Sequence, residues 1–394
     1  MIEADMDSGV YPKRPVEIAR ARGATIWDSE GKEYLDMGAS YGVCNVGHCN
    51  PEVVEALRAQ AGELIYISST YPTPRRRELL EKIINISPPG MARVFLANSG
   101  TEANEAALRF SMHVTGRERI VSTMRAFHGR TMASLSTTWN KKHSQGNARP
   151  GLPVDFVPYG NEEGLKETIT GDTAALILEP VQGEGGVHLP PVGFLRAARD
   201  ICTDRGTLLI MDEIQTGMAR TGKIFAVEHS NIVPDIMTVG KSLGGGYPIA
   251  AAVLHENMGE MERGLHGSTF GGNPLGCAAG CAAIDQMIEL DLAGRARTLG
   301  EHFTRRLSSV DIPAFRDVRG LGLMVAVELK GKNTPYLNGM LDRGIAPLPS
   351  GNTVIRFLPP LVVEKAQIDR TVDALTEIAD GDGDRVPQRA PQAQ

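Results

Sequence analysis

A lysine stands between a short apolar run and a glycine-rich turn, a setting that can produce a reactive amine. Residues 236–239 read Ile-Met-Thr-Val, Lys241 follows one residue later, and residues 244–246 are all glycine. The run predicts a buried strand, and the glycines let the backbone approach a ligand closely. Where water is scarce, a lysine pKa falls and its amine becomes a nucleophile suited to Schiff-base chemistry. An ordinary lysine at a strand end is the alternative. A nucleotide-binding loop is excluded, because Asp235 stands where its first glycine is needed.

A carboxylate stands at the end of a second apolar run. Residues 207–211 read Thr-Leu-Leu-Ile-Met and predict a buried strand, which Asp212 follows directly. A carboxylate buried there is costly unless a cation meets it. The protonated pyridine nitrogen of pyridoxal phosphate is such a cation, and an acidic partner keeps that cofactor an electron sink. A helix cap or turn residue is the alternative for Asp212 alone.

A third apolar run, residues 93–97, leads into Ser99, Gly100 and Thr101. Apolar side chains then recur at positions 103, 106, 107 and 110, as on one face of a helix. A strand, a Ser-Gly-Thr turn and a helix start bring hydroxyls and free amides to a helix N-terminus, where a phosphate is stabilised. A plain helix cap is the alternative.

Six segments, in order and at compatible spacing, resemble the class III, fold type I pyridoxal-phosphate aminotransferases over nearly the whole chain. They are Asn-Ser-Gly-Thr-Glu-Ala-Asn at 98–104, Phe-His-Gly-Arg-Thr at 127–131, Glu-Pro-Val-Gln-Gly-Glu-Gly-Gly at 179–186, Asp-Glu-Ile-Gln-Thr-Gly at 212–217, Gly-Lys-Ser at 240–242 and His-Gly-Ser-Thr-Phe-Gly-Gly-Asn-Pro at 266–274.

The resemblance implies a role for each cofactor-binding residue. Lys241 holds pyridoxal 5'-phosphate covalently and moves the proton, Asp212 meets the pyridine nitrogen, and Ser99, Gly100 and Thr101 bind the phosphate. Phe127 stacks on the ring, with ordinary core packing as its alternative, and Gln215 donates to the phenolic oxygen. Thr269 reaches the phosphate of a neighbouring subunit, which implies a homodimer with a shared site.

The same resemblance implies four substrate-binding residues. Arg130 binds the substrate α-carboxylate, and Ser268 lies near the substrate. Glu184 masks Arg356 while an ω-amine is bound and releases it for the α-carboxylate of glutamate. Arg356 lies in Arg-Phe-Leu-Pro-Pro at 356–360, which matches the family's Arg-x-x-Pro-Pro segment. A purely structural ion pair between domains is the alternative for Glu184 and Arg356.

The implied activity is a ping-pong transamination between glutamate or 2-oxoglutarate and a terminal semialdehyde. Within class III, residues 266–274 are typical of the acetylornithine side. Residues 40–48 and 354–360 resemble enzymes of lysine biosynthesis, which act on aminoadipate semialdehyde borne on the terminal glutamate of an amino-group carrier protein. The alternatives are a 4-aminobutyrate or ornithine-type aminotransferase, an aminomutase that needs no acceptor, and a non-catalytic protein of the same fold.

Composition predicts no nucleic acid or membrane partner. The 41 Lys and Arg face 47 Asp and Glu, giving a net charge of −6 without a basic footprint, and no apolar stretch approaches membrane-spanning length. The five cysteines form no CxxC pair and suggest no metal site. Reduced thiols and an acidic N-terminus without a signal-peptide pattern favour a cytoplasmic chain.

Seven apolar runs alternate with helical segments and predict a mainly parallel α/β sheet covered by helices on both faces. They are residues 94–97, 120–124, 154–157, 174–178, 207–211, 236–239 and 249–254, and a helix rich in small residues is expected at 275–290. We expect residues 46–290 to form the large cofactor-binding domain and 291–380 a small α+β domain. The resemblance implies that residues 1–45 pack with the small domain, and the composition of residues 381–394 predicts a disordered tail.

A carrier-linked substrate needs an open channel edged with positive charge. Such an edge could come from residues 125–149, which include Arg125, Lys141, Lys142, His143 and Arg149. A plain solvated basic loop is the alternative.

Overall fold

The seven apolar runs form one sheet in the computed structural model, which describes residues 6–140 and 151–381. Its strand order is β4-β10-β9-β8-β7-β5-β6. The strands are β4 (Met91–Ala97), β5 (Arg119–Thr123), β6 (Val154–Val157), β7 (Thr173–Leu178), β8 (Leu208–Asp212), β9 (Ile236–Val239) and β10 (Ala250–His255). All seven predicted strands are confirmed, although β4 begins three residues earlier than predicted.

The directions of these strands bring the residues that follow their carboxyl ends to one edge of the sheet. Neighbours from β9 through β8, β7 and β5 to β6 pair in parallel, and β10 is antiparallel to both β9 and β4. Every strand of this sheet except β10 therefore points the same way. Their carboxyl ends lie at a common edge, which is where open α/β sheets bind ligands.

Helices cover both faces of the sheet. On one face Leu176 of β7 clusters with Phe194 and Leu195 of α8 (Phe194–Arg205). On the other face, Ile177 clusters with Phe110 of α5 (Gly100–Thr115). The remaining helices of this lobe are α3 (Pro51–Glu63), α4 (Pro74–Ile86), α6 (Met132–Ser136), α7 (Glu162–Thr168) and α9 (Pro274–Glu289). The predicted small-residue helix is thus confirmed as α9, which packs against α3 and α4.

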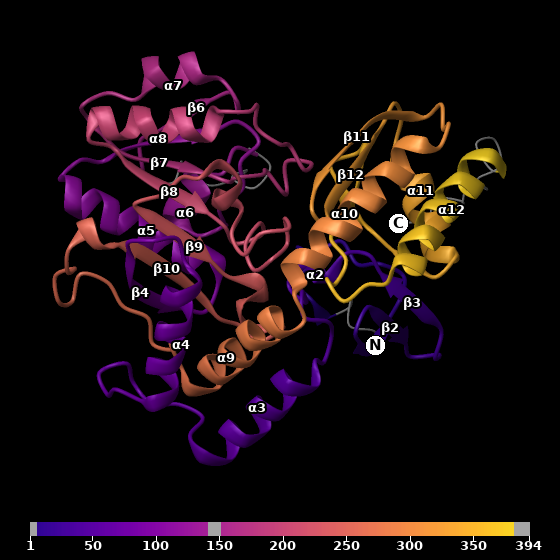
Figure 1. Ribbon diagram of the computed structural model, residues 1–394, viewed down its shortest axis with the longest axis horizontal. Coiled ribbons are helices and arrows are strands. Elements are labelled where there is room, and N and C mark those ends of the chain that lie inside the picture. The colour runs from indigo at the N-terminus through magenta and orange to yellow at the C-terminus, as the bar shows by residue number, and fades with distance from the viewer. Residues whose placement is uncertain (1–5, 141–150, 382–394) are drawn as a thin grey trace.

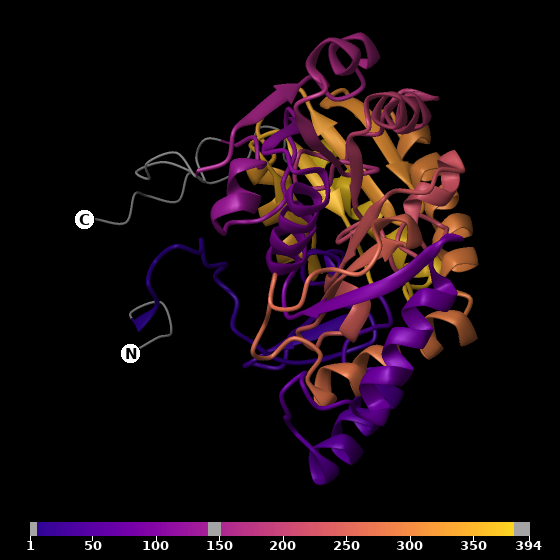
Figure 2. The ribbon, with the colours of Figure 1, turned by 90° about the vertical axis from the view of Figure 1, so that its left-hand side faces the viewer.

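A second lobe holds the C-terminal elements (Figure 1). Its sheet has the order β11-β12-β15-β14, and α10, α11 and α12 lie beside it. The bounds are β11 (Phe315–Leu321), β12 (Met324–Leu329), β14 (Leu348–Ser350), β15 (Val354–Phe357), α10 (Leu292–Ser309), α11 (Thr334–Asp342) and α12 (Lys365–Gly381). Seen after a 90° turn, these elements lie behind the large lobe (Figure 2).

The N-terminal strands form a third, small sheet with a strand from far along the chain. It comprises β1 (Ile18–Arg22), β2 (Thr25–Asp28), β3 (Glu33–Asp36) and β13 (Ile345–Ala346), and β3 pairs with β13 in parallel. The short helix α2 (Ala39–Gly42) follows β3. The division into domains at residues 45 and 290 stays a prediction. Residues 382–394, where a disordered tail was predicted, lie outside the described part of the chain, and Gly381 ends α12.

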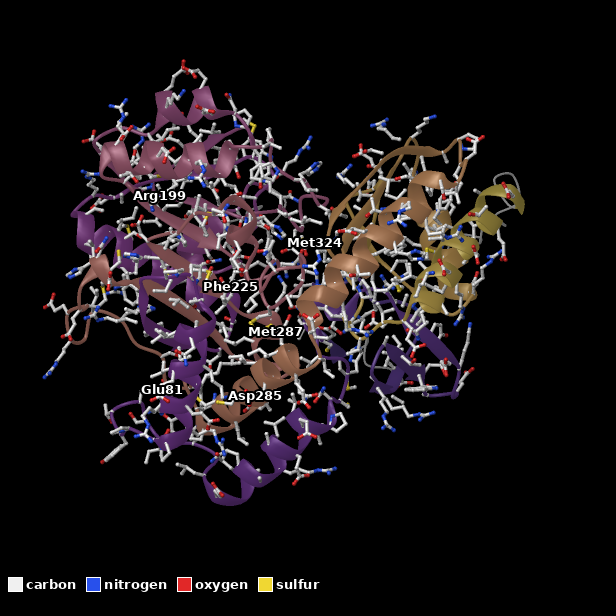
Figure 3. The ribbon with its side chains drawn as sticks, viewed as in Figure 1. Glu81, Arg199, Phe225, Asp285, Met287 and Met324 are labelled. Atoms are coloured by element: carbon white, nitrogen blue, oxygen red, sulfur yellow. The ribbon has the colours of Figure 1, made fainter. Side chains whose placement is uncertain are left out.

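Buried side chains also join the two lobes. Phe225 and Met287 belong to the principal core, whereas Met324 of β12 belongs to a smaller cluster with Val181 and Val187 of the large lobe (Figure 3). This cluster holds the segment that follows β7 against the C-terminal sheet. Over residues 6–140 and 151–381, no helix is long and apolar enough to cross a membrane. The same residues contain no group of three or more potential metal ligands, and all five cysteines are free.

Candidate active site

Asp212 ends β8 and is held by donors from three different segments. Its Oδ2 accepts hydrogen bonds from His128 Nδ1 and Asn104 Nδ2, each at 2.8 Å, and its Oδ1 accepts one from the Ile214 amide at 3.1 Å. Asn104 is fixed in turn by donation from Thr238 of β9. The carboxylate is only 4% exposed. A buried carboxylate oriented in this way is prepared to meet a cation.

Lys241 follows β9 at the same edge and begins the short helix η3 (Lys241–Gly244). Its φ of 44° lies in the left-handed region, which is strained for a residue with a side chain. Burial lowers the pKa of its amine, against the opposing influence of Glu184, Asp212 and Glu179. The amine forms no hydrogen bond or ion pair with any described residue. Lys241 therefore offers an amine that is more nucleophilic than an ordinary lysine.

The N-terminus of α5 lies at the end of β4. Ser99 is its N-cap, and Ser99 and Glu102 form a reciprocal capping box. The next two amides, of Gly100 and Thr101, belong to the first turn and have no partner inside the helix. They are the free donors that a phosphate group needs, and the helix dipole adds to the attraction.

Glu184 and Arg356 form a bidentate ion pair between the two lobes. The two guanidinium nitrogens lie 2.9 and 3.0 Å from the two carboxylate oxygens, and Arg356 Nη1 also donates to the Gly183 carbonyl at 2.9 Å. Arg356 is fully buried on β15. Although burial raises the pKa of Glu184, Arg356 lowers it further, so the pKa of Glu184 lies below its ordinary value. Glu184 is ionised at neutral pH and neutralises the arginine.

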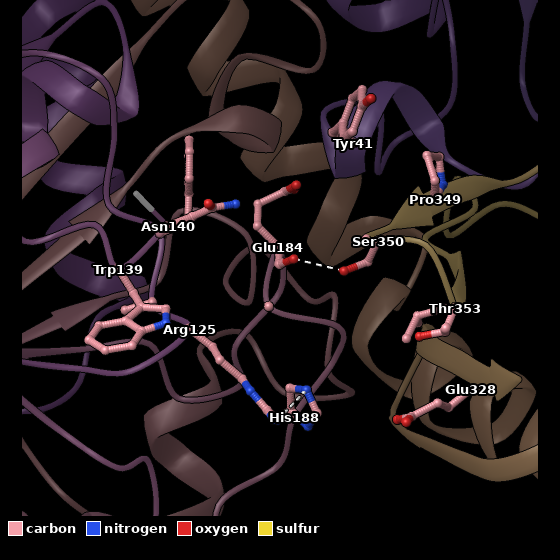
Figure 4. Close-up of a pocket in the computed structure, with 15 residues that line it drawn as sticks. Tyr41, Arg125, Trp139, Asn140, Glu184, His188, Glu328, Pro349, Ser350 and Thr353 are labelled. Carbon is pink, nitrogen blue, oxygen red and sulfur yellow. Dashed lines mark hydrogen bonds between the residues drawn. The ribbon is translucent and has the colours of Figure 1, made fainter. Parts of the chain in front are cut away.

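A cavity of about 720 Å³ opens beside this pair (Figure 4). The large lobe contributes Phe127, Trp139 and Glu184 to its wall, and the small lobe contributes Ser350 and Thr353. Ser350 Oγ donates to the Glu184 carbonyl at 2.8 Å across the junction. The cavity is thus lined by both lobes and is large enough for a small-molecule substrate.

The other predicted residues lie around the same edge. Gln215 Nε2 approaches Glu184 Oε1 at 3.3 Å, and its buried Oε1 has no hydrogen-bond partner in the described chain. Arg130 is exposed, with its guanidinium carbon 5.7 Å from the centre of the Phe127 ring. Ser268 Oγ accepts a hydrogen bond from Asn98 at 3.1 Å, and the Thr269 carbonyl accepts one from Tyr66 at 3.0 Å. The structure therefore places Ser268 beside the segment that leads into α5.

Three further buried residues organise the site: His128, Asn104 and Glu179. The sequence pattern assigns no role to His128 or Asn104, and it marks Glu179 only as a candidate chemical residue at a strand end. Glu179 accepts hydrogen bonds from the Phe127 and Gly183 amides, both at 3.0 Å. Asn104 had a usable signal, because it lies on α5 among otherwise apolar buried positions. His128 and Glu179 stood inside recognised segments, but their partners are distant in sequence.

The arrangement suits pyridoxal phosphate by its own chemistry. Three groups lie at one sheet edge: a nucleophilic amine, a buried carboxylate whose one basic hydrogen-bond partner among the described residues is His128, and the N-terminus of α5. The buried Oε1 of Gln215 has no hydrogen-bond partner in the described chain. Gly183 makes room for it, because a Cβ at position 183 would lie 1.8 Å from this oxygen. An unpaired acceptor therefore remains beside the cavity. The fold and the residues at this edge fit a fold type I, pyridoxal-phosphate-dependent enzyme.

Comparison with known proteins gives the family. The chain belongs to the class-III aminotransferases, whose family model matches residues 8–379. It is 46% identical over 392 residues to a LysW-aminoadipate semialdehyde transaminase from Deinococcus radiodurans, covering 98% of this chain and 91% of the relative. It is 43% identical to an acetylornithine aminotransferase from Methanocaldococcus jannaschii, covering 94% of both chains.

Solved structures agree with these relatives. An acetylornithine aminotransferase from Elizabethkingia anophelis superposes with a TM-score of 0.86 at 34% identity, covering 96% of this chain and 97% of that one. An ornithine aminotransferase from Toxoplasma gondii, with partial occupancy of PLP at its active site, superposes with a TM-score of 0.90 at 32% identity, covering 94% and 91%. The family thus implies pyridoxal phosphate as cofactor, and the predicted class, fold type and enzyme activity are confirmed.

Proposed function

We propose that the protein is an ω-aminotransferase of lysine or arginine biosynthesis. It moves an amino group between glutamate or 2-oxoglutarate and a terminal semialdehyde. The aldehyde substrate is carrier-protein-linked 2-aminoadipate semialdehyde, the semialdehyde that corresponds to N-acetylornithine, or both. The names of the Deinococcus and Methanocaldococcus relatives support these two substrates in particular.

The observation that carries the proposal is the bidentate pair of Glu184 and Arg356 at the cavity. While an ω-amine donor is bound, Glu184 and Arg356 stay paired and carry no net charge, and the chain of the donor extends past them. Glutamate brings an α-carboxylate close to its amine, and that carboxylate binds Arg356 once Glu184 moves aside. One cavity thereby serves two substrates in alternating half-reactions. Arg130 is assigned to the α-carboxylate of the ω-amino substrate, and Ser268 to a position beside it.

We assign the cofactor to residues at the sheet edge. Ser99, Gly100 and Thr101 bind its phosphate, Asp212 faces the pyridine nitrogen, Phe127 stacks on the ring, Gln215 donates to the phenolic oxygen and Lys241 attaches it covalently. When bound, pyridoxal phosphate supplies an aldehyde for the amine and an electron sink for the neighbouring carbon. Nζ of Lys241 takes the proton from the nitrogen-bearing carbon of the amine donor in one half-reaction and delivers a proton to the corresponding carbon of the acceptor in the other.

A homodimer that shares its site completes the proposal. Thr269 is assigned to the phosphate site of the second copy. Tyr66, which binds the Thr269 carbonyl, packs on Phe270 with ring centres 5.3 Å apart, and Ile65 and Phe270 are 59% and 60% exposed. Exposed apolar side chains beside Thr269 support contact with another chain.

The test is glutamate formation from N-acetylornithine and 2-oxoglutarate by the purified holoenzyme. We expect glutamate only when both compounds are present. Turnover of the amine without 2-oxoglutarate supports the aminomutase alternative. A preference for 4-aminobutyrate or free ornithine supports the other aminotransferase types. A protein that shows no visible absorbance band on addition of the cofactor, or one that keeps its band in Lys241→Ala, contradicts an enzyme that uses Lys241.

A further inference from the structure

Two basic side chains at the cavity, Arg125 and His188, have no part in the proposed reaction. Arg125 Nη1 donates to His188 Nε2 at 3.1 Å, and both residues line the cavity. They point toward one another at its edge, with Glu328 and Thr353 of the small lobe across from them (Figure 4). Accepting this hydrogen bond requires an unprotonated Nε2, so His188 is a neutral partner. In agreement, burial and then Arg319 and Arg125 lower the pKa of His188.

The backbone holds this pair in place. Arg125 follows β5 in a turn and has a φ of 69°, a strained value for a residue with a side chain. Gly185 permits the turn, because a Cβ at position 185 would lie 2.8 Å from the Arg125 carbonyl oxygen. Gln182 pairs with His188 through two backbone hydrogen bonds, of 3.0 and 3.1 Å, and its side chain donates to the Met124 carbonyl at 2.8 Å. Both halves of the pair are therefore fixed by one hairpin.

The charge of Arg125 is not balanced by any carboxylate in the described residues. Arg319, the other arginine near His188, is instead paired with carboxylates. It donates to Asp317 and Glu328, at 2.7 and 2.8 Å, and to the Gly186 and Val187 carbonyls. Glu328 is thereby neutralised by Arg319, with further help from Arg316. Arg125 has five N–H donors and uses one of them on a neutral ring.

We propose that Arg125, positioned by His188, binds a second carboxylate on the ω-amino substrate, carried by the acyl group on its α-nitrogen. This inference rests on the proposed function, in which Arg130 takes the first carboxylate and the acyl group occupies the outer part of the cavity. The substrate class is an ω-amino acid whose α-nitrogen is acylated by a dicarboxylic acid. A glutamyl-linked carrier presents such a carboxylate, whereas an acetyl group presents none.

Two ornithine derivatives test the site. N-acetylornithine and N-succinylornithine share the amine and the α-carboxylate and differ in the distal carboxylate. For the wild-type holoenzyme we expect kcat/KM to be about tenfold higher for the succinyl compound, as for one charge-assisted bidentate contact. Arg125→Gln should lower this ratio to about one while leaving the value for N-acetylornithine within about twofold. Arg125→Asn repeats the loss with a side chain that tolerates positive φ.

Matched controls separate a specific contact from general charge. Lys330→Gln removes one positive charge from an exposed side chain outside the cavity lining, and it should leave the ratio unchanged. His188→Phe removes the acceptor of Arg125 and should lower the ratio without removing the charge. Equal ratios in wild type and both Arg125 variants, or a wild type that does not distinguish the two compounds, overturn the proposal.

A binding measurement keeps this test separate from that of the proposed function. N-succinylnorvaline and N-acetylnorvaline lack the reacting amine, and Trp139 in the cavity wall reports their binding by fluorescence. We expect tighter binding of the succinyl compound to wild type and equal binding of both compounds to Arg125→Gln. If neither ornithine derivative yields glutamate, the part of the proposed function that concerns N-acetylornithine is wrong. The norvaline titration then still decides for or against the carboxylate site.

Discussion

Asp212 shows how the groups around a buried carboxylate can fix its orientation. His128 and Asn104 both donate to one of its oxygens, which fixes the plane of the carboxylate, while the other oxygen accepts a hydrogen bond from the Ile214 amide. The side chain cannot turn away without breaking two hydrogen bonds at once. The orientation of Asp212 is therefore set before any ligand binds.

Replacing Asp212 with Asn tests this charge. Asp212→Asn should still bind pyridoxal phosphate, but the half-reaction with glutamate should slow by several orders of magnitude, because a neutral amide does not stabilise a pyridinium. Single-turnover absorbance measures this rate. Asp235→Asn is the control, since Asp235 also flanks a central strand but pairs with Arg199 away from the site. A near-normal rate in Asp212→Asn would show that the assigned role is wrong.

The pair of Glu184 and Arg356 predicts opposite effects for two substitutions. Arg356→Ala should slow the glutamate half-reaction by about 10²-fold or more, because a bidentate partner of the α-carboxylate is lost, and should affect the ω-amine far less. Glu184→Gln should unmask the arginine and favour glutamate over the ω-amine.

Separate stopped-flow measurements of the two half-reactions distinguish these outcomes. Asp155→Asn, which removes a carboxylate from a surface pair with Arg119, serves as the control. Equal losses in both half-reactions for both variants would reduce the pair to a structural bridge.

At the scale of elements, one carboxylate connects two loops that build the cavity. Glu179 follows β7, and its carboxylate accepts a hydrogen bond from the Phe127 amide in one loop and another from the Gly183 amide in the other loop. We expect Glu179→Ala to lower kcat/KM about 10²-fold for both substrates, since misplacement of positioning groups costs about this much. Glu179→Gln keeps one acceptor oxygen and should recover part of the loss. A substrate-selective defect, measured in the two half-reactions, would contradict a shared positioning role.

A second buried carboxylate, Glu213, anchors the short helix η2 (Ala226–Ser230) and predicts a pH effect on stability. It accepts hydrogen bonds from the Val227 amide at 2.8 Å and from Thr216. Burial raises its pKa from 4.5 to about 7. A raised folded-state pKa gives stability that is fully present below pH 4.5 and is lost as the pH rises through 7.

Relative to Glu213→Gln, wild type should therefore lose up to about 3 kcal/mol of unfolding free energy across this range. Chemical denaturation of both proteins from pH 4.5 to 8 measures the difference. A difference that does not vary with pH would mean that Glu213 is charged throughout the range.

The elements show what the residue pattern could and could not predict. Continuous apolar runs identified all seven strands of the large sheet, because strands covered on both faces need apolar side chains throughout. The antiparallel direction of β10 was not predictable, since residues 250–255 have the same pattern in either direction. The partners of His128 and Glu179 were likewise hidden, because contacts between distant segments leave no local spacing to detect.

At the scale of the whole molecule, the salt dependence of the rate distinguishes a carrier-linked substrate from a free one. A carrier protein that docks by charge should lose kcat/KM as ionic strength rises, because salt screens interactions beyond about 10 Å at 0.1 M. Turnover of N-acetylornithine should hardly change. Competition between the carrier-linked semialdehyde and N-acetylornithine, repeated at raised salt, measures both effects. If kcat/KM for the carrier-linked semialdehyde is no higher than for N-acetylornithine and does not depend on salt, the protein belongs with the arginine-pathway enzymes. Of the predicted docking edge, Lys141, Lys142, His143 and Arg149 lie outside the described residues.

The parallel pairing of β3 with β13 has a consequence for how the chain is made. Leu35 pairs with Ile345, so 310 positions separate two neighbours in one small sheet. A ribosome releases the first strands long before their partner exists, and loop closure over such a distance is entropically costly. The small sheet must therefore remain incomplete until β13 has emerged. Completion of the smallest sheet is a late event in biosynthesis, because it depends on β13 having left the exit tunnel.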